Sequence, residues 1–501
     1  MLHVDKSCGG LKKVEPVEVS NHHSLRLRRL LSYGGTDQLC SQVTINKLPD
    51  EVLLEIFDFY IACPPPYEED AWHTLVHVCR RWRYAVFGSP HRLNLRLLCM
   101  KGRLVKALDI WPELPIVIHV DDHNVCQPPS VTDVISMLKL HDRVCKIFID
   151  DVPNLFLEEI ATTSEPFPAL IELKLVSSYK ADRPILPNSF LGGFVPRLRS
   201  LDVSGIPFPG IGKLLLSTHN LVTLSLEFIP RSGYISPESM VTILSGLTRL
   251  KSLYFNFQSP EFWAHGAGQR PPALTRVVLP ALTNVDFYGN SEYLEDMVSR
   301  IDAPLECIAV AFEELVFDIP LLRDFIGRTQ ILNAPHRADT SFSDFEAIIS
   351  LFRRKEDVDF EVLYLEILCN PSDSQPSSFA RACNLLLPTL PSLEHLGIDG
   401  SGGLPLSWQH GVGLTQWMEF LRPFITVKDL VLNEQAVLSV SSALQELVGE
   451  RRVTEILPAL QNIFLEGFQS SSPVPECIAK FIAARELSGR PIIVHHGEKK
   501  Q

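Results

Sequence analysis

Apolar residues recur along most of the chain in the pattern Leu-x-x-Leu-x-Leu, where another aliphatic residue or Phe can fill each position. This alternation is typical of a strand with one buried side. Because 46% of the residues are hydrophobic, a single match carries little weight. The pattern starts at Val144, Leu170, Leu198, Leu221, Leu250, Leu282, Leu305, Val362, Leu393, Val427 and Leu460.

The residues around these matches indicate that the pattern is part of a repeat. Five share a proline two residues before the first position, at Pro168, Pro196, Pro280, Pro391 and Pro458. Starts are 23–34 residues apart, with one interval of 57 residues before Val362. Helical patterns lie between them, for example over 239–244 and 414–424. A repeated strand–turn–helix unit stacks into a solenoid. In the long interval we expect two helices, Leu321–Arg328 and Phe342–Arg353, and a degenerate strand near Ile331–His336.

We place the solenoid at residues 126–495 and a short tail at 496–501. Residues 101–125 form the predicted junction and N-terminal cap, with a strand over Ile116–Val120. A helix over Pro475–Leu487, followed by a strand over Pro491–Val494, is the predicted C-terminal cap.

The N-terminal part has a different pattern. Residues 1–42, with one basic run at Leu25–Leu30, are predicted to be a disordered tail. For the run, a nuclear signal and a fragment of amphipathic helix are the alternatives. The stretch Leu48–Tyr60 predicts a helix with Pro49 in its first turn, where the missing N–H has no cost. Apolar residues at offsets of three and four give it a broad stripe. After a proline-rich break, Ala71–Phe87 predicts a second helix.

These two helices carry specific residues at 43–100 that resemble an F-box. The pattern Leu-Pro-x-Glu-hydrophobic-Leu-x-x-Ile-Phe stands at 48–57, and Val-Cys-Arg-x-Trp stands at 78–82. Together with the repeats, the chain is similar to fungal F-box proteins with degenerate leucine-rich repeats. The resemblance implies an α/β fold: a helical F-box, then an irregular leucine-rich-repeat solenoid of parallel strands alternating with helices.

The resemblance also implies a role. F-box modules bind a Skp-family adaptor, which joins them to a cullin and a RING subunit, so the chain is expected to be a substrate receptor of a ubiquitin ligase. By resemblance, the core of the module and its adaptor surface consist of Leu48, Pro49, Ile56, Phe57, Val78, Cys79 and Trp82.

The residues between the pattern positions predict a substrate-binding face, since alternate side chains of a strand point to opposite sides. The candidates are Tyr254, Asn256, Asp286, Tyr288, Asp202 and Glu227. The same face is expected to carry Ser200, Thr223, Ser225, Ser252, Asn284, His395 and Asp399. Its acidic members favour a basic or neutral protein segment over a phosphorylated one, which would need clustered arginine or lysine.

The charge of the chain and the motifs that it lacks argue against several other classes of function. A net charge of −13 argues against nucleic-acid binding. The sequence contains no run of 18 apolar residues, so we expect no membrane span. Its 11 scattered cysteines predict a reducing compartment, the cytoplasm and/or the nucleus. We find no catalytic or metal-binding motif and expect no enzyme activity, cofactor or metal. Two alternatives stay open: an F-box scaffold without a substrate, and a solenoid enzyme with an unrecognised site.

Overall fold

The computed structural model describes residues 45–62, 72–98, 113–121, 130–150, 154–177, 185–257, 275–312, 319–329, 331–343, 346–355, 358–368, 390, 392–402, 414–449, 453–468 and 473–497. The predicted tail at 1–42 and its basic run lie outside these residues. Contacts divide the chain into a helical unit, which ends at Leu93, and a sheet unit, which for the described residues begins at Asn94.

The helical unit contains η1 (Ile45–Lys47), α2 (Asp50–Ala62), α3 (Trp72–Val78) and α4 (Arg80–Gly88). The prediction of one continuous second helix is wrong, because Cys79 is extended, with φ −157° and ψ 170°. The Sγ of Cys79 accepts a hydrogen bond from the Trp82 N–H at 3.5 Å and caps α4. Before the break, Arg83 Nε donates to the Val76 carbonyl at 3.0 Å. One free backbone group at each of these helix ends is thereby satisfied.

A small apolar core packs the three helices together. Phe57 is fully buried, and its ring centroid lies 4.7 Å from that of the half-buried Trp82. An ion pair between Arg81 and Asp50, at 2.6 Å, links α4 to the start of α2. The other side chains of this core are Leu53, Trp72, Val76 and Val86, each at most 1% exposed.

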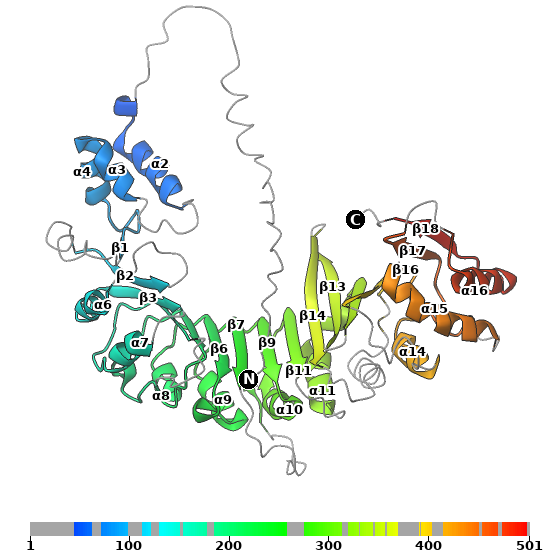
Figure 1. Cartoon of the computed structure of the whole chain (residues 1–501). Helices are drawn as coiled ribbons and strands as arrows, with labels where there is room; N and C mark the ends of the chain where they lie inside the picture. Colours follow the sequence, from blue (N-terminus) through cyan, green and yellow to red (C-terminus); the bar gives the residue numbers. More distant parts are fainter. Residues whose placement is uncertain are drawn as a thin grey trace, which may run out of the picture. The chain divides into compact units, whose positions relative to one another are not determined.

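In the sheet unit, sixteen described strands form one sheet in the order β1-β2-β3-β4-β5-β6-β7-β9-β11-β14-β13-β12-β15-β16-β17-β18 (Figure 1). A separate parallel pair joins β8 (Val277–Val278) to β10 (Ile301–Asp302). The strands of the large sheet are β1 (Leu97–Leu98), β2 (Ile116–Asp121), β3 (Val144–Asp150), β4 (Glu172–Val176), β5 (Ser200–Ser204), β6 (Thr223–Ile229), β7 (Ser252–Phe257), β9 (Asn284–Gly289), β11 (Cys307–Phe312), β12 (Arg337–Ser343), β13 (Glu346–Lys355), β14 (Val358–Leu368), β15 (His395–Gly402), β16 (Asp429–Asn433), β17 (Asn462–Glu466) and β18 (Ile493–His496).

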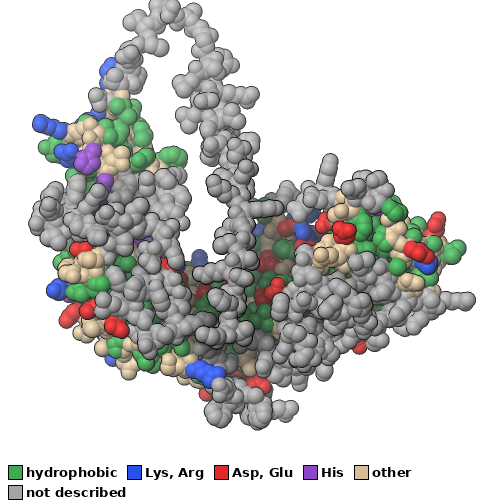
Figure 2. Space-filling view, in the orientation of Figure 1, with side chains coloured by type: hydrophobic (Ala, Val, Ile, Leu, Met, Phe, Trp, Pro, Cys, Tyr) green, Lys and Arg blue, Asp and Glu red, His purple; other side chains and the backbone are tan. Residues whose placement is uncertain are grey.

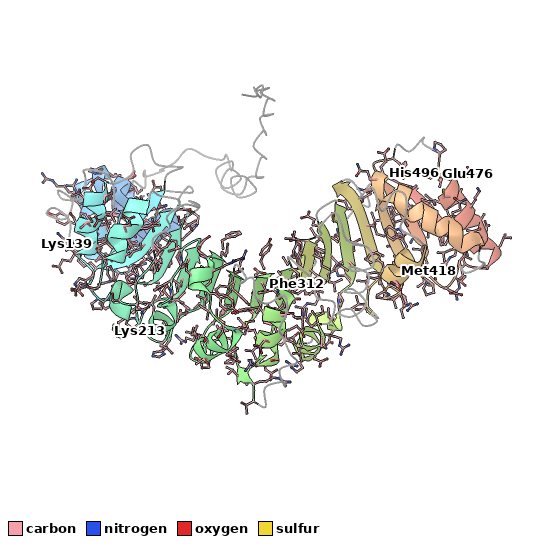
Figure 3. All side chains as sticks on the ribbon, turned by 60° about the horizontal axis from the view of Figure 1, so that its bottom comes forward. Lys139, Lys213, Phe312, Met418, Glu476 and His496 are labelled. Atoms are coloured by element: carbon pink, nitrogen blue, oxygen red, sulfur yellow. The ribbon has the colours of Figure 1, made fainter. Side chains whose placement is uncertain are left out.

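Helices cover one face of this sheet, which curves so that its other face points inward (Figure 1). Seen from another direction, Lys213 of α8 and Met418 of α14 lie on the helical side (Figure 3). The α-helices are α6 (Val131–Leu138), α7 (Asn154–Ala161), α8 (Ile211–Leu215), α9 (Pro237–Leu244), α10 (Ser291–Ser299), α11 (Pro320–Thr329), α14 (Leu414–Leu421), α15 (Glu434–Gly449) and α16 (Glu476–Leu487). Short 3₁₀ turns are η2 (Phe190–Gly193), η3 (Arg231–Gly233) and η5 (Ile331–Asn333).

The predicted apolar pattern becomes a ladder of aligned side chains under the helices. Each strand that the pattern predicts is present, and in most of them the first pattern residue, such as Leu198 or Leu250, is buried just before the strand. Neighbouring repeats also share one backbone bond: for example, the Lys251 N–H donates to the Val222 carbonyl at 2.8 Å. One rung of the ladder runs in register through Leu173, Leu201, Leu224, Leu253, Val285, Ile308 and Leu363.

The 57-residue interval departs from the prediction. Helix α11 is present, but Phe342–Arg353 is not a helix and Ile331–His336 is not a strand. Strands β12 and β13 stand there instead, and β13 runs antiparallel to both neighbours, so the strands are not all parallel. The reason is a two-residue period, in which Ala347, Ile349 and Leu351 are buried on one side of β13.

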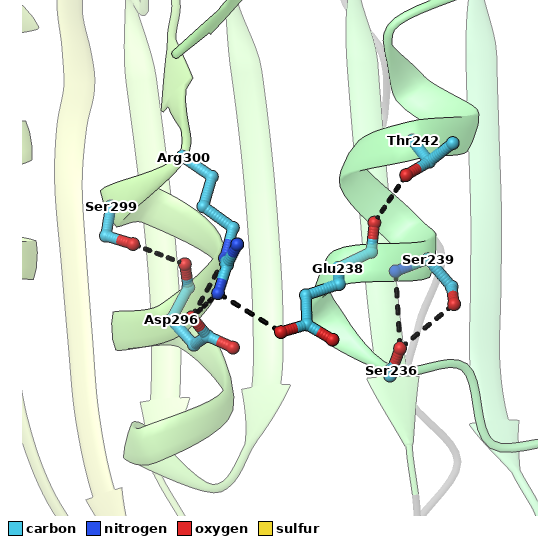
Figure 4. Close-up of polar contacts among 7 residues, drawn as sticks. All are labelled: Ser236, Glu238, Ser239, Thr242, Asp296, Ser299 and Arg300. Atoms are coloured by element: carbon cyan, nitrogen blue, oxygen red, sulfur yellow. Dashed lines mark hydrogen bonds and ion pairs between the residues drawn. The ribbon is translucent and has the colours of Figure 1, made fainter. Parts of the chain in front are cut away.

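Charged side chains link neighbouring helices of the outer layer. Arg300, which follows α10, contacts Asp296 at 2.8 Å and Glu238 of α9 at 3.3 Å (Figure 4). At the start of α9, the Ser236 hydroxyl accepts the Ser239 N–H at 3.2 Å and caps the helix.

The C-terminal end of the sheet unit contains a buried charge. Arg485 of α16 is 0% exposed, although it has no carboxylate partner among the described residues. Its guanidinium donates instead to three backbone carbonyls, those of Val453 (3.1 Å), Leu457 (3.4 Å) and Leu460 (3.1 Å). The side chain therefore connects α16 to the turn that leads into β17.

Replacing Arg485 with Ala should lower the free energy of unfolding of the sheet unit by about 2 kcal/mol, because three buried carbonyls lose their donor. Chemical denaturation followed by circular dichroism measures this change. Arg490→Ala is the control: this exposed arginine also donates to a carbonyl, that of Pro458 at 2.8 Å, and its loss should cost less than about 0.5 kcal/mol. Equal losses in both variants would contradict the conclusion that Arg485 connects α16 to the turn before β17.

Candidate functional site

The helical unit exposes apolar side chains beside its core. Val52, Ile56, Phe59 and Tyr60 follow one another at helical spacing on α2 and are 42%, 42%, 73% and 42% exposed. Val78, at the end of α3, is 56% exposed. We call these five residues the apolar helix surface. The apolar part of α2 is thus wider than its own unit covers, and an exposed patch of this kind is typical of a binding surface.

The residues predicted to bind an adaptor divide between core and surface. Phe57 is buried, so it supports the unit from inside. Leu48, Cys79 and Trp82 are half-buried. Pro49, Ile56 and Val78 are exposed. The predicted adaptor set did not include Val52, Phe59 and Tyr60, which lie at offsets of three and four from Ile56 and are also exposed.

Arg81 holds the entry to α2 in place. Its guanidinium donates to Asp50 Oδ1, at 3.0 Å from Nε and 2.6 Å from Nη2, and also to the Leu48 carbonyl. A single side chain from α4 therefore fixes both the turn at Pro49 and the first residue of α2. This orients the apolar helix surface relative to α4.

The second candidate surface is the inward face of the sheet. Across β7 and β9, Ser252 pairs with Asn284, Tyr254 with Asp286 and Asn256 with Tyr288. These predicted residues therefore stand side by side. Asp202 and Glu227 extend the set to β5 and β6, where Asp202 pairs with Ser225.

Three predicted members differ from expectation. Asn256 is only 8% exposed, and Tyr288 stands opposite it in the next strand. His395 and Asp399 lie on β15, which is separated from β9 by β11, β14, β13 and β12. They belong to a different part of the inward face from Tyr254 and Asp286.

Acidic side chains gather on this face, as Figure 2 shows. Burial, followed by the charges of Glu227 and Glu361, raises the pKa of Asp286 to about 6. Burial also raises the pKa of Asp202 above its usual value. Next to them, burial and the charges of Asp286 and Glu361 raise the pKa of the Cys307 thiol to about 11. The middle of the face thus holds several negative charges at close range.

The sequence prediction did not include Glu361, because a bulge in β14 changes the face of the sheet on which this residue lies. In the pairing of β13 with β14, Leu351 pairs with Leu363, whereas Phe352 pairs with Glu361, so Val362 is the extra residue. Without this bulge, alternation would have placed Glu361 under the helices. Two further inward residues, Tyr364 and Glu366, follow the alternation from the Val362 match and could have been found; the Tyr364 hydroxyl donates to Glu366 at 2.8 Å.

A polar hollow of about 1050 Å³ occupies the inward face from β14 through β13, β12, β15 and β16 to β17. Here His395 Nδ1 lies 2.9 Å from Asp429, and Arg337 lies 2.7 Å from Asp339. Gly397 leaves room for the Asp339 carboxylate, which lies 2.7 Å from where a Cβ would be. The sequence prediction missed this hollow because it assigned a helix to residues of β12 and β13. Other lining residues include Thr340, Ser341, Asp359, Asp399, Asn433 and Glu466.

Models of known protein families and the sequences of curated proteins give no match to this chain. In the described part of the chain, no helix has the length and apolar character needed to cross a membrane. The same residues contain no group of three His, Cys, Asp or Glu side chains placed to hold a metal ion. The chain is a mixed α/β protein with a large, mostly parallel sheet, and its two candidate sites are surfaces.

The raised pKa of Asp286 predicts a pH-dependent stability. In the unfolded chain this carboxyl ionises near pH 4, but in the folded chain it ionises near pH 6. The folded state is therefore favoured below pH 4, and this advantage is lost as the pH rises through 6. Asp286→Asn should raise the free energy of unfolding by about 1 kcal/mol at pH 8, after allowance for solvent screening.

Urea denaturation at pH 8 and pH 3 measures this gain, which should vanish at the lower pH, where the carboxyl is protonated in both states. Asp150→Asn serves as the control, because the Asp150 carboxylate pairs with Lys174 at 3.0 Å and its removal should not stabilise the chain. A gain for Asp286→Asn that is equal at both pH values would contradict the electrostatic cause.

Proposed function

We propose that this chain is a substrate-receptor subunit of a cullin–RING ubiquitin ligase. In this proposal the helical unit is an F-box that binds a Skp-family adaptor, and the sheet unit is an irregular leucine-rich-repeat solenoid that binds a protein substrate. The chain itself performs no chemistry, because a partner enzyme transfers ubiquitin. Its place of action is the cytoplasm, the nucleus or both.

One observation carries the proposal. The residues that match the F-box pattern fold into a unit with too few residues to bury its own apolar surface. Pattern residues Phe57 and Trp82 pack together, while Ile56 stays exposed near Val52 and Phe59 on α2, and Val78 stays exposed at the end of α3. A helical partner with a matching apolar groove would cover this surface, as amphipathic helices are covered in other complexes.

The sheet unit supports the second half of the proposal. Its described inward face is open across many strands, and tyrosines such as Tyr254 and Tyr288 stand there among short polar and acidic side chains. Tyrosine offers a large contact area at a low cost in conformational entropy. The inward face therefore suits recognition of a protein segment better than catalysis.

Replacing Ile56 and Phe59 together with Asp should abolish capture of the adaptor while the chain stays folded, because both side chains are exposed in the free protein. Co-purification with a Skp-family adaptor measures capture, and circular dichroism checks the fold. We expect at least about a hundredfold loss of affinity, since a charged group would be buried without a partner at each position.

The matched control replaces Glu55 and Asp58 with Ala on the polar side of α2, where both are exposed. This variant should bind the adaptor within about twofold of the wild type. If the wild-type chain captures no adaptor, or if the Asp variant captures it normally, the F-box assignment is wrong. Capture of adaptor and cullin without any ubiquitylated partner would favour a scaffold.

A further inference from the structure

Helix α2 carries more apolar surface than one side of a helix can hold. At about 100° per residue, and apart from the first residue of the helix, its apolar positions fill an arc of about 220°. A helix that packs on a single core usually shows an apolar stripe of about 100°. In order around this arc, the positions are Phe59, Val52, Ile56, Tyr60, Leu53, Phe57, Ile61 and Leu54.

One half of the arc is buried and the other half is exposed. Leu53, Leu54 and Phe57 are 0%, 8% and 0% exposed, whereas Val52 and Phe59 are 42% and 73% exposed. Each half contains one phenylalanine and branched aliphatic side chains, so burial of either half gives a similar transfer free energy. A turn of α2 by about 100° around its axis would exchange the two halves. The hydrophobic effect alone therefore selects only weakly between two rotations of this helix.

A polar contact at the start of α2 distinguishes the two rotations. Asp50 precedes Leu53 and Phe57 by three and seven residues, so it lies on the core side of the helix. Arg81 of α4 donates to Asp50 Oδ1 from Nε at 3.0 Å and from Nη2 at 2.6 Å, and it also binds the Leu48 carbonyl. In the other rotation Asp50 would leave α4, and the contact with Arg81 would break.

The second ion pair of α2 among the described residues does not have this effect. It joins Arg92 to Glu55 on the polar side of the helix, where the Glu55 side chain is 73% exposed. Two long side chains in solvent can follow a rotation of the helix at little cost. The Arg81–Asp50 contact is therefore the one that depends on the rotation of α2.

We propose that Arg81 is a positioning residue that sets the rotation of α2 and so determines which apolar side the helix offers to the adaptor. The inference rests on the proposed function, because it takes the apolar helix surface as the docking site. A polar contact of this kind adds little stability but selects one arrangement among several of similar free energy. Without it the free unit populates both rotations, and the apparent Kd rises by the inverse of the docking-competent fraction.

The test measures association and dissociation rates of purified Skp-family adaptor on the immobilised full chain. Arg81→Met leaves Asp50 beside α4 without its donor, which favours the other rotation. We expect about a tenfold rise in Kd, equivalent to about 1.4 kcal/mol. The change should lie in the association rate, because the docked state keeps its contacts. Asp50→Ala/Arg81→Met should recover to within about threefold of the wild type, because no carboxylate is left without a partner.

The matched control is Arg92→Met, which removes the pair with Glu55 and should keep the Kd within about twofold of the wild type. A direct contact between Arg81 and the adaptor would give a different result. It would raise the dissociation rate, and the double variant would bind as weakly as Arg81→Met. Either of these outcomes overturns the proposal.

Thiol labelling resolved by peptide mass spectrometry reports the rotation without any adaptor. Val52→Cys should react fast and Leu54→Cys slowly, since these positions are 42% and 8% exposed. Adding Arg81→Met should speed labelling of Leu54→Cys at least about fivefold, because the rate follows the population of the exposed state, while circular dichroism stays unchanged. An unchanged rate would overturn the role of Arg81 and leave adaptor docking standing. A wild-type chain that binds no adaptor would overturn the proposed function itself.

Discussion

Most strands of the sheet unit carry a row of buried apolar side chains, and a single repeat cannot cover that row alone. Stacking in register solves this for all repeats at once, as in the rung from Leu173 through Leu224 to Ile308. Because the helices cover only this side, the alternate residues are left on an open inward face. The position of each candidate binding residue therefore depends on burial of the leucines behind it.

Burial of one side of the strands also explains how much of the fold could be predicted from the sequence. Strands such as β5 and β7 follow from the leucine pattern, because burial on one side forces a period of two. Residues such as Tyr254 and Asp286 then fall on the inward face without further information. The pattern failed in the long interval, where Ile348-Ile349 and Leu351-Phe352 also fit a helical period. Alternation alone cannot distinguish these two structures when apolar residues come in pairs.

Two other misses have local causes. The bulge at Val362 rotates Glu361 onto the inward face, and a single extra residue of this kind leaves no mark in the hydrophobic pattern. In the helical unit, the extended Cys79 divides a stretch that has good helical periodicity throughout. The division of the F-box residues into buried Phe57 and exposed Ile56 required the packing of all three helices.

The two candidate surfaces differ in the kind of interaction that they offer to a partner. The apolar helix surface offers apolar side chains such as Phe59, whose burial is favourable, whereas the inward face of the sheet offers carboxylates such as Asp286 and Glu361, which repel one another. Hydrogen–deuterium exchange of the full chain, with and without saturating purified Skp-family adaptor, tests the central claim of an adaptor-docking helical unit most directly. The account predicts protection over residues 50–62 and 72–88 and unchanged exchange in β6, β9 and β14. Absence of protection in those helices, or protection confined to the sheet, would contradict it.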